Sequence, residues 1–167
     1  ADFFQAETDE GMFMLGANAQ YATTSTDIHG TTDRAKYEGQ SYGFAANATY
    51  YGFDGLYADL RGQVNRFSAD YSVDGQVYAK GKRGMNYGLS FEIGKEMMLD
   101  EHNSFVPQLQ MNWVRTDADA FTDNFGNQVD PGTSDHHSAR AGLAYEHKKD
   151  NVNWGLAASV IRDIRNE

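Results

Sequence analysis

The sequence predicts an all-β protein, an antiparallel up-and-down transmembrane β-barrel, from the alternation, the composition and the spacing of its segments. Long stretches alternate apolar and polar residues with period two, as strands do when their two faces meet different surroundings. In residues 105–113 one face carries Phe105, Pro107, Leu109, Met111 and Trp113, and the other carries Gln108, Gln110 and Asn112. An apolar face backed by an amide-lined face fits a barrel wall between lipid and water better than a soluble core.

Composition favours many strands joined by turns. The 167 residues include 17 Gly, 10 Tyr and 10 Phe but only 2 Pro, which suits a helical bundle poorly. This length predicts a single domain, residues 1–167. Mean hydropathy is −0.65, and no apolar run approaches the roughly 18 residues of a membrane helix. Barrel strands dilute such averages because half of their residues face the lumen.

Charge and cysteine content exclude several classes of function. The chain has no Cys, which rules out structural disulfides, cysteine-based zinc sites and cysteine catalysis. Its formal charge of −10 argues against a nucleic-acid partner, because such proteins concentrate Lys and Arg. No signal peptide precedes Ala1, so we expect a mature chain, a piece of a longer one, or a cytoplasmic protein.

Seven strands follow in order along the chain. They are predicted at residues 12–23, 41–51, 56–67, 85–96, 105–114, 138–146 and 153–162. The apolar faces of the first three are Phe13, Leu15, Ala17, Ala19 and Tyr21; Tyr42, Phe44, Ala46, Ala48 and Tyr50; and Leu56, Ala58, Leu60, Gly62 and Val64. Those of the fourth and sixth are Tyr87, Leu89, Phe91 and Ile93, and Ala139, Ala141, Leu143 and Tyr145. Nothing of useful length indicates a helix.

Connections between these strands alternate in length. Short ones are expected at Asp54-Gly55, which favours a two-residue hairpin loop, and at residues 100–104 and 148–151. Long ones are expected at 25–41, where 25–33 forms an acidic and small-residue loop, and at 67–84 and 116–136. Outer-membrane barrels show this asymmetry, with short periplasmic turns and long external loops.

Aromatic residues gather near the strand ends, where amphipathic rings favour the headgroup level of a membrane. The predicted membrane-interface aromatics are Tyr21, Tyr50, Tyr51, Phe53, Phe67, Trp113, Tyr145 and Trp154. An ordinary soluble sheet is also rich in aromatics, so the prediction depends on the loop asymmetry and the polar second face.

The polar faces supply the candidate site. Asp59 and Arg61 are two residues apart and share a face, with polar residues expected opposite them on the neighbouring strands. The predicted pore-lining residues are Asp59, Arg61, Gln63, Asn65, Glu92, Gln108, Gln110, Asn112, Arg140 and Glu146. Such a set predicts either a stiffening hydrogen-bonded lattice or a hydrophilic channel lining.

Catalytic and metal sites are not predicted. The neighbours His136 and His137 would point to opposite faces of a strand and cannot share a metal. The acidic run from Asp117 to Asp130 lacks the Gly and Glu placement of a calcium loop and predicts a solvated loop. No nucleophile elbow occurs. We therefore expect no enzyme, no cofactor and no metal.

Several segments resemble one family in the right order. Residues 105–113 resemble the strand that autotransporter translocator barrels write as aromatic-x-Glu-Pro-Gln-x-Gln-Leu, and residues 121–127 resemble the Phe-Thr-Asp-x-x-Gly loop that follows it. Weaker similarities occur at 55–60, 87–94 and 138–143. Two departures stand out: Val106 replaces a frequent Glu, and Pro107 removes a ladder donor, for which a local bulge is expected.

The resemblance implies a function. It implies the central part of a twelve-stranded barrel in the outer membrane of a Gram-negative bacterium, with about one strand before this chain and three after it. It also implies that the barrel anchors an N-terminal passenger and helps to export it without catalysis. The implied partners are outer-membrane lipid, the chain's own passenger domain and the barrel-assembly machinery.

Two other readings of the residues stay open at this point. A self-contained barrel of eight strands, acting as an adhesin or structural protein, would use residues 2–7 as its first strand. An outer-membrane barrel enzyme or a soluble lipocalin-like carrier would also give alternating strands. Closure of the sheet separates the first of these from a barrel fragment, because a fragment leaves two edges open.

Overall fold

The protein is built from strands alone in the part that the computed structural model describes, residues 2–30, 34–149 and 152–164. The strands are β1 (Asp2–Glu7), β2 (Gly11–His29), β3 (Arg34–Gly52), β4 (Leu56–Val73), β5 (Gln76–Lys95), β6 (Met97–Met98), β7 (Asn103–Ala118), β8 (Phe121–Thr122), β9 (Gln128–Val129), β10 (Thr133–Lys149) and β11 (Val152–Ile164). Within those residues no helix is long and apolar enough to cross a membrane.

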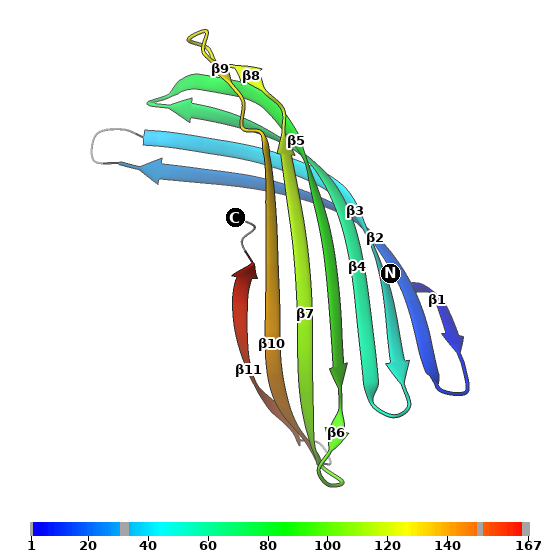
Figure 1. Ribbon diagram of the computed structural model, residues 1–167. Coiled ribbons are helices and arrows are strands. Elements are labelled where there is room, and N and C mark those ends of the chain that lie inside the picture. Colours follow the sequence, from blue (N-terminus) through cyan, green and yellow to red (C-terminus); the bar gives the residue numbers. More distant parts are fainter. Residues whose placement is uncertain (1, 31–33, 150–151, 165–167) are drawn as a thin grey trace.

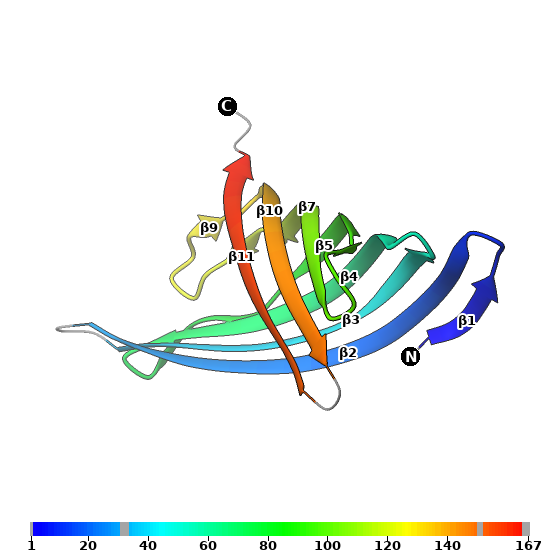
Figure 2. The same cartoon turned by 90° about the horizontal axis from the view of Figure 1, so that it is seen from below.

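These strands form one curved antiparallel sheet in the order β1-β2-β3-β4-β5-β7-β10-β11, with β6 paired to β7 (Figure 1). Seen along the strands, the sheet is an open half-barrel whose edges are β1 and β11 (Figure 2). Each edge strand has one partner among the described strands, so the closed eight-stranded barrel is not what forms. The up-and-down antiparallel topology is confirmed.

All seven predicted strands are present, but most are longer than predicted. β2 continues to His29 and β3 begins at Arg34, so the loop expected over residues 25–41 is wrong, although residues 31–33 lie outside the described part. The loop expected over 67–84 is likewise mostly strand. These extensions have polar residues on both faces, so their side chains do not alternate between apolar and polar. Their strands pair through backbone hydrogen bonds, which do not need that alternation.

The two ends of the sheet differ, and we call them the turn end and the extended end. At the turn end, residues 53–55 join β3 to β4 and residues 8–10 join β1 to β2; residues 150–151 of the predicted last turn lie outside the described part. At the extended end, β2 to β5 continue beyond the body of the sheet and curve over to one side (Figure 1).

The tightest hairpin lies at the extended end. Asp74 (φ 50°) and Gly75 (φ 77°) both have positive φ, as a two-residue hairpin loop with the twist of its strands requires. At Asp54-Gly55 only Gly55 (φ 86°) does, and the connection has three residues. That site is a turn as predicted, but the two-residue geometry expected there occurs at the other Asp-Gly instead.

Pro107 lies in a regular stretch of β7. Its pairing with Leu143 of β10 shows no register shift, so the bulge expected there is absent. On the other side, the β5–β7 ladder ends at Gln108, and the next pairing is that of β6 at Phe105. The missing N–H of Pro107 therefore coincides with a break between β5 and β6.

The sheet has almost no apolar interior. Among the described residues the buried hydrophobic side chains are Ala45, Ala69 and Ala79. The large apolar side chains instead stand exposed on one face of the sheet, and the register sets them side by side across the strands. One such row is Leu15, Ala48, Leu60, Phe91, Met111 and Ala139. An apolar face of this extent must be covered by another apolar phase.

Candidate functional site

A row of polar side chains crosses the face opposite the apolar one. Asp59 of β4 pairs with Glu92 of β5, Glu92 with Gln110 of β7, and Gln110 with Arg140 of β10. Thr49 of β3 extends the row by donating from Oγ1 to Asp59 Oδ2 at 2.6 Å. Four residues that the sequence predicted from separate strands therefore occupy one register line.

The strongest contact in this row spans a strand. Arg140 Nη2 lies 2.6 Å from Glu92 Oε2, although β7 separates their strands, and it also reaches Gln108 Oε1 at 3.3 Å. The hydroxyl of Tyr57 donates to the other carboxylate oxygen, Glu92 Oε1, at 2.9 Å. Charge-assisted hydrogen bonds of this kind are the stronger ones in proteins.

The polar face is the concave one. Strands lie about 4.8 Å apart, so the side chains of Glu92 and Arg140 meet across two strand spacings by converging above Gln110. Their side chains are 21% and 32% exposed, whereas Leu60 and Met111 on the apolar face are 46% and 53% exposed. Curvature toward the polar side brings side chains together on the polar face and spreads them apart on the apolar face.

Farther along the same face, a second contact spans a strand above a glycine. Gln20 of β2 and Asn65 of β4 both pair with Gly43 of β3, and the Gln20 amide donates to Asn65 Oδ1 above it. A Cβ on Gly43 would lie 1.9 Å from that oxygen and 2.5 Å from the backbone oxygen of Val64. Only glycine leaves room for this contact.

The other predicted pore-lining residues lie on the same face. Asp59, Arg61, Gln63, Gln110 and Asn112 contribute to one hollow of about 370 Å³. Glu146 is close to the turn end, where Lys148 Nζ lies 2.7 Å from its Oε2 and 3.5 Å from Glu96 Oε1. Gln108 and Asn65 make the contacts described above. The register thus brings the predicted set onto one surface, and pore lining itself stays a prediction.

Five of the eight predicted interface aromatics lie on the apolar face. Phe53 lies in the turn between β3 and β4, and the other two point the opposite way. Tyr51 pairs with Tyr57, and Phe67 pairs with Gly84, in the register of Asp59 and Asn65. Tyr51 and Phe67 therefore point to the concave side, and the placement of the eight residues at a membrane interface stays a prediction. At strand ends the sequence does not show which face an aromatic residue takes, because aromatic residues can follow one another directly, as Tyr50 and Tyr51 do.

At the turn end, aromatic side chains of β7, β10 and β11 pack on the apolar face. Ring centroids are 5.6 Å apart for Phe105–Tyr145, 5.4 Å for Tyr145–Trp154 and 5.5 Å for His147–Trp154. The Tyr145 hydroxyl donates to Asn103 Oδ1 at 2.5 Å. Apolar rings with polar partners at this level are typical of an interface band.

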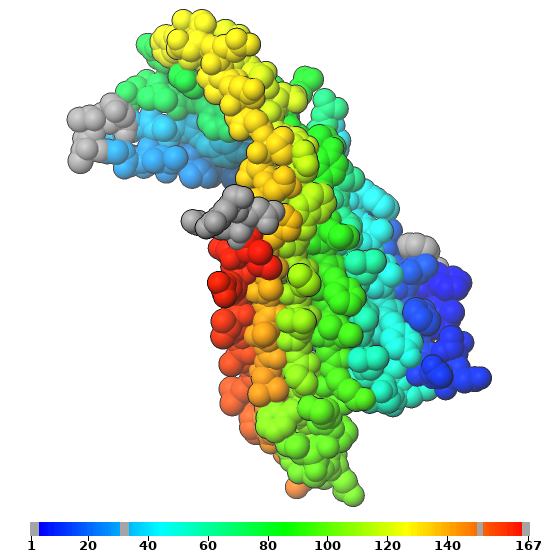
Figure 3. All heavy atoms as spheres, in the orientation of Figure 1, coloured from blue at the N-terminus to red at the C-terminus, as the bar shows by residue number. Residues whose placement is uncertain are grey.

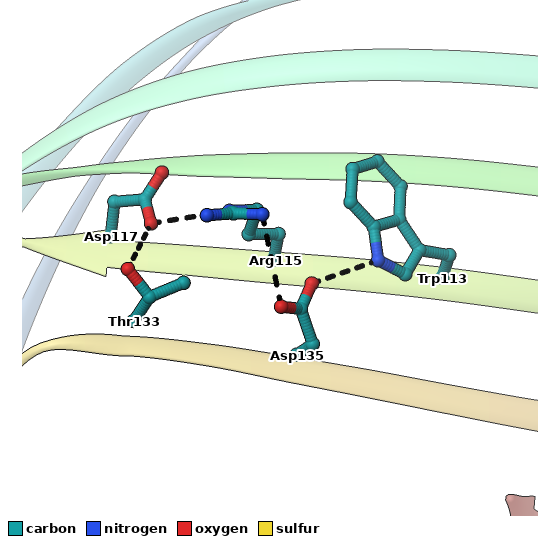
Figure 4. Close-up of polar contacts among 5 residues, drawn as sticks. All are labelled: Trp113, Arg115, Asp117, Thr133 and Asp135. Carbon is teal, nitrogen blue, oxygen red and sulfur yellow. Dashed lines mark hydrogen bonds and ion pairs between the residues drawn. The ribbon is translucent and has the colours of Figure 1, made fainter. Parts of the chain in front are cut away.

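At the extended end of the same face, charged residues follow Trp113 (Figure 4). The Trp113 indole donates to Asp135 Oδ1 at 3.0 Å, and Arg115 lies 3.8 Å from Asp135 Oδ2. Arg115 also bonds Asp117 Oδ1 at 3.2 Å, which accepts from Thr133 Oγ1 at 2.7 Å. The Arg115 guanidinium thus pairs with two carboxylates, and each carboxylate also accepts a hydrogen bond from a neutral donor.

The loop between β7 and β10 is folded and docked. Asp123 is 5% exposed and accepts from the backbone N–H groups of Phe125 (2.9 Å) and Asn127 (2.8 Å) and from the Asn127 side chain (2.9 Å). These bonds, led by that of the Asn127 side chain, lower the pKa of Asp123. A fully solvated acidic loop, as predicted, is therefore wrong for this residue.

The docking partner is the end of the β4–β5 hairpin. The backbone N–H of Asn124 donates to Tyr78 O at 3.1 Å, and Lys82 Nζ lies 4.5 Å from the centre of the Phe121 ring. Figure 3 shows this loop in yellow against the green end of the hairpin. The Phe-Thr-Asp-x-x-Gly motif was the only sequence signal, with Gly126 (φ 86°) closing the turn around Asp123.

Known proteins match this arrangement. A family model described as "Autotransporter beta-domain" matches residues 4–166. The chain belongs to the autotransporter β-domain family. The resemblance found in the sequence is thereby confirmed, together with the terms autotransporter, β-barrel, outer membrane and secretion that go with the family.

Two individual relatives agree with the family. The chain is 33% identical over 141 residues to the "Adhesin BmaC autotransporter" of Brucella suis biovar 1 (strain 1330), a match that covers 83% of this chain but 4% of that protein. A solved structure, the β-domain of the Bordetella autotransporter BrkA, superposes with a TM-score of 0.64 at 14% identity. That superposition covers 90% of this chain and 74% of the other, and it shows the shared fold.

Proposed function

We propose that this autotransporter β-domain forms wall strands of an outer-membrane barrel that anchors a passenger domain and helps to export it to the surface of a Gram-negative bacterium. The observation that carries the proposal is the separation of the two faces. The apolar face suits lipid, and the concave polar row suits a water-filled lumen through which a polypeptide passes. The proposed role is conduit and anchor, without catalysis.

The open edges fit a larger barrel. An edge strand in lipid would leave backbone N–H and C=O groups without partners, at a cost of several kcal/mol each. We therefore propose that strands outside this chain continue the sheet from β1 and β11 to complete a twelve-stranded barrel. Insertion by the barrel-assembly machinery belongs to the same proposal, because such a barrel is stable only once it is closed.

Orientation follows from the two ends. Outer-membrane barrels have short periplasmic turns and longer external segments. We propose that the turn end faces the periplasm and that the extended end, with the β4–β5 hairpin and its docked loop, faces the cell exterior. The predicted pore-lining residues then lie between the two ends, at membrane depth.

Cysteines introduced one at a time at two neighbouring positions test the proposal, because the chain has no native Cys that would also be labelled. Spin labels on the full-length protein in liposomes should show a lipid environment for Met111→Cys and a water environment for Gln110→Cys. In cells, antibody labelling of the passenger should require the stretch that this chain contributes. Equal water access at both labels, or passenger display without this stretch, would overturn the proposal.

A further inference from the structure

Two arginines on neighbouring strands face outward without a carboxylate partner. In the register, Arg66 of β4 lies opposite Met85 of β5, and Ser68 lies opposite Arg83, so the two arginines are diagonal neighbours on the apolar face. Both side chains are exposed. Among the described residues, neither side chain makes an ion pair or a hydrogen bond.

Both arginines mark the border of the apolar band. Along β4 the outward positions run through Leu60, Gly62 and Val64 to Arg66. Along β5 they run from Phe91 through Leu89, Tyr87 and Met85 to Arg83. Each arginine is the first charged outward residue beyond the apolar run of its strand, and in a membrane this is the level of the headgroups.

Among the described residues, no carboxylate near the pair contacts either guanidinium group, including that of Asp119, whose backbone N–H donates to Arg83 O at 2.9 Å. The other three have partners elsewhere. Asp117 bonds Arg115 and Thr133. Glu38 lies 2.8 Å from Lys36 Nζ, and Asp70 accepts from the backbone N–H of Gly81 at 2.5 Å. The chain therefore does not neutralise the two guanidinium groups, in contrast to Arg115 at the same border (Figure 4). Like charges this close repel each other unless an anion lies between them.

A hollow lies where these side chains meet. Its volume is about 300 Å³, and it is lined by Gln40, Tyr42, Arg66, Phe67, Ser68 and Arg83. Two guanidinium groups, two hydroxyls and an amide offer donors. None of the lining side chains is a carboxylate. Planar guanidinium forks match phosphate oxygens in a bidentate manner, which makes arginine the preferred cation at such a site.

We propose that this outward hollow binds the phosphate of a lipid headgroup in the leaflet at the extended end of the barrel. The inference rests on the membrane orientation proposed above. A bound phosphate would neutralise the repulsion between the two arginines and would fix the height of the barrel in that leaflet. The ligand class is a phosphorylated glycolipid or phospholipid, held through its phosphate and not through its acyl chains.

Binding to the full-length protein in detergent micelles tests the inference, with diphosphoryl lipid A and its dephosphorylated form as probes. Arg66→Gln and Arg83→Gln should each weaken diphosphoryl lipid A binding about 10-fold, as expected for one lost charge-assisted contact. Arg66→Lys should lie between wild type and Arg66→Gln. Lys149→Gln is the control, because it removes the same charge from the outward side of β10 at the turn end and should change binding less than about twofold.

Three results would overturn the inference: equal binding by wild type and the double Gln variant, equal binding of the dephosphorylated lipid, or full competition by millimolar inorganic phosphate. The last would show a small-anion site instead of a headgroup site. Passenger display in cells separates this test from that of the proposed function. If the arginine variants lose lipid binding but still display the passenger, the inference is supported and the translocator role stands. If the wild-type protein displays no passenger, the translocator role is refuted.

Discussion

The guanidinium of Arg140 and the carboxylate of Glu92 meet at 2.6 Å although β7 separates their strands. Curvature toward the polar face favours such a contact, because it tilts the side chains of neighbouring strands toward one another. It therefore links the shape of the half-barrel to its chemistry. The pair, with Tyr57 and Gln108, stiffens the face that we propose faces the lumen.

Glu92→Gln should destabilise the barrel by about 1–2 kcal/mol, because it removes the charge from a part-buried hydrogen bond that Arg140 makes. Urea unfolding of the full-length protein in liposomes measures this. The matched control is Glu38→Gln, which breaks the exposed Lys36–Glu38 pair and should cost clearly less, because solvent screens that pair. Equal effects at the two sites would contradict a special role for the Arg140–Glu92 pair.

Gly43→Ala should cost about 1–3 kcal/mol, since the new Cβ would overlap Asn65 Oδ1 and the backbone oxygen of Val64. Gly62→Ala is the control on the opposite face, where a Cβ meets nothing within 4 Å. The stability of both variants is measured as the temperature at which the band of the folded protein disappears on a gel. If Gly62→Ala destabilises as much as Gly43→Ala, steric overlap with Asn65 and Val64 does not explain the loss at Gly43, because a Cβ at Gly62 meets nothing and Ala suits a strand better than Gly.

Asp123→Ala should undock the loop between β7 and β10 while the barrel stays folded, because Asp123 accepts the hydrogen bonds that hold residues 123–127 together. Limited proteolysis of intact cells should then cut within residues 119–132 at least about 10-fold faster, as local unfolding becomes frequent. Asp119→Ala, an exposed residue in the same loop, should be cut at the wild-type rate. Equal protection of both variants would show that docking does not depend on Asp123.

The docked loop should also depend on pH at both extremes. The pKa of Asp123 is lowered by its hydrogen bonds, so its contribution is present above the unfolded pKa, about 3.9, and is lost as pH falls through the lower folded value. The pKa of Tyr78 is raised by its bond to Asp123, so that contribution is lost as pH rises above about 10.

Amide hydrogen exchange at Phe125 and Asn127 measures this dependence. Once intrinsic exchange rates are corrected for, protection should be constant from about pH 5 to 9, between the two ordinary pKa values. A midpoint near neutrality would contradict the assignment, because neither Asp123 nor Tyr78 titrates there.

Strand positions were predictable because alternation is a local property. In β7, Phe105 to Trp113 show both faces within nine residues. Long strands that follow one another in the chain also pair in the sheet, as expected for a meander. The extensions of β2 and β3 were not predictable, since residues such as Ser25 and Lys36 place polar groups on the face that is apolar in the body of the sheet. Their ladder is held by backbone hydrogen bonds, which leave no trace in side-chain polarity.

Alternation and motifs along the chain were enough to predict seven strands, the opposition of an apolar and a polar face, and the family to which the chain belongs. Which polar residues meet became clear only in the folded sheet: Arg140 with Glu92 across β7, Gln20 with Asn65 over Gly43, and Asp123 with a distant hairpin. The folded sheet also turned Tyr51 and Phe67 to the concave side. Alternation depends on neighbours two residues apart, whereas these contacts depend on register and curvature, which all strands of the sheet set together.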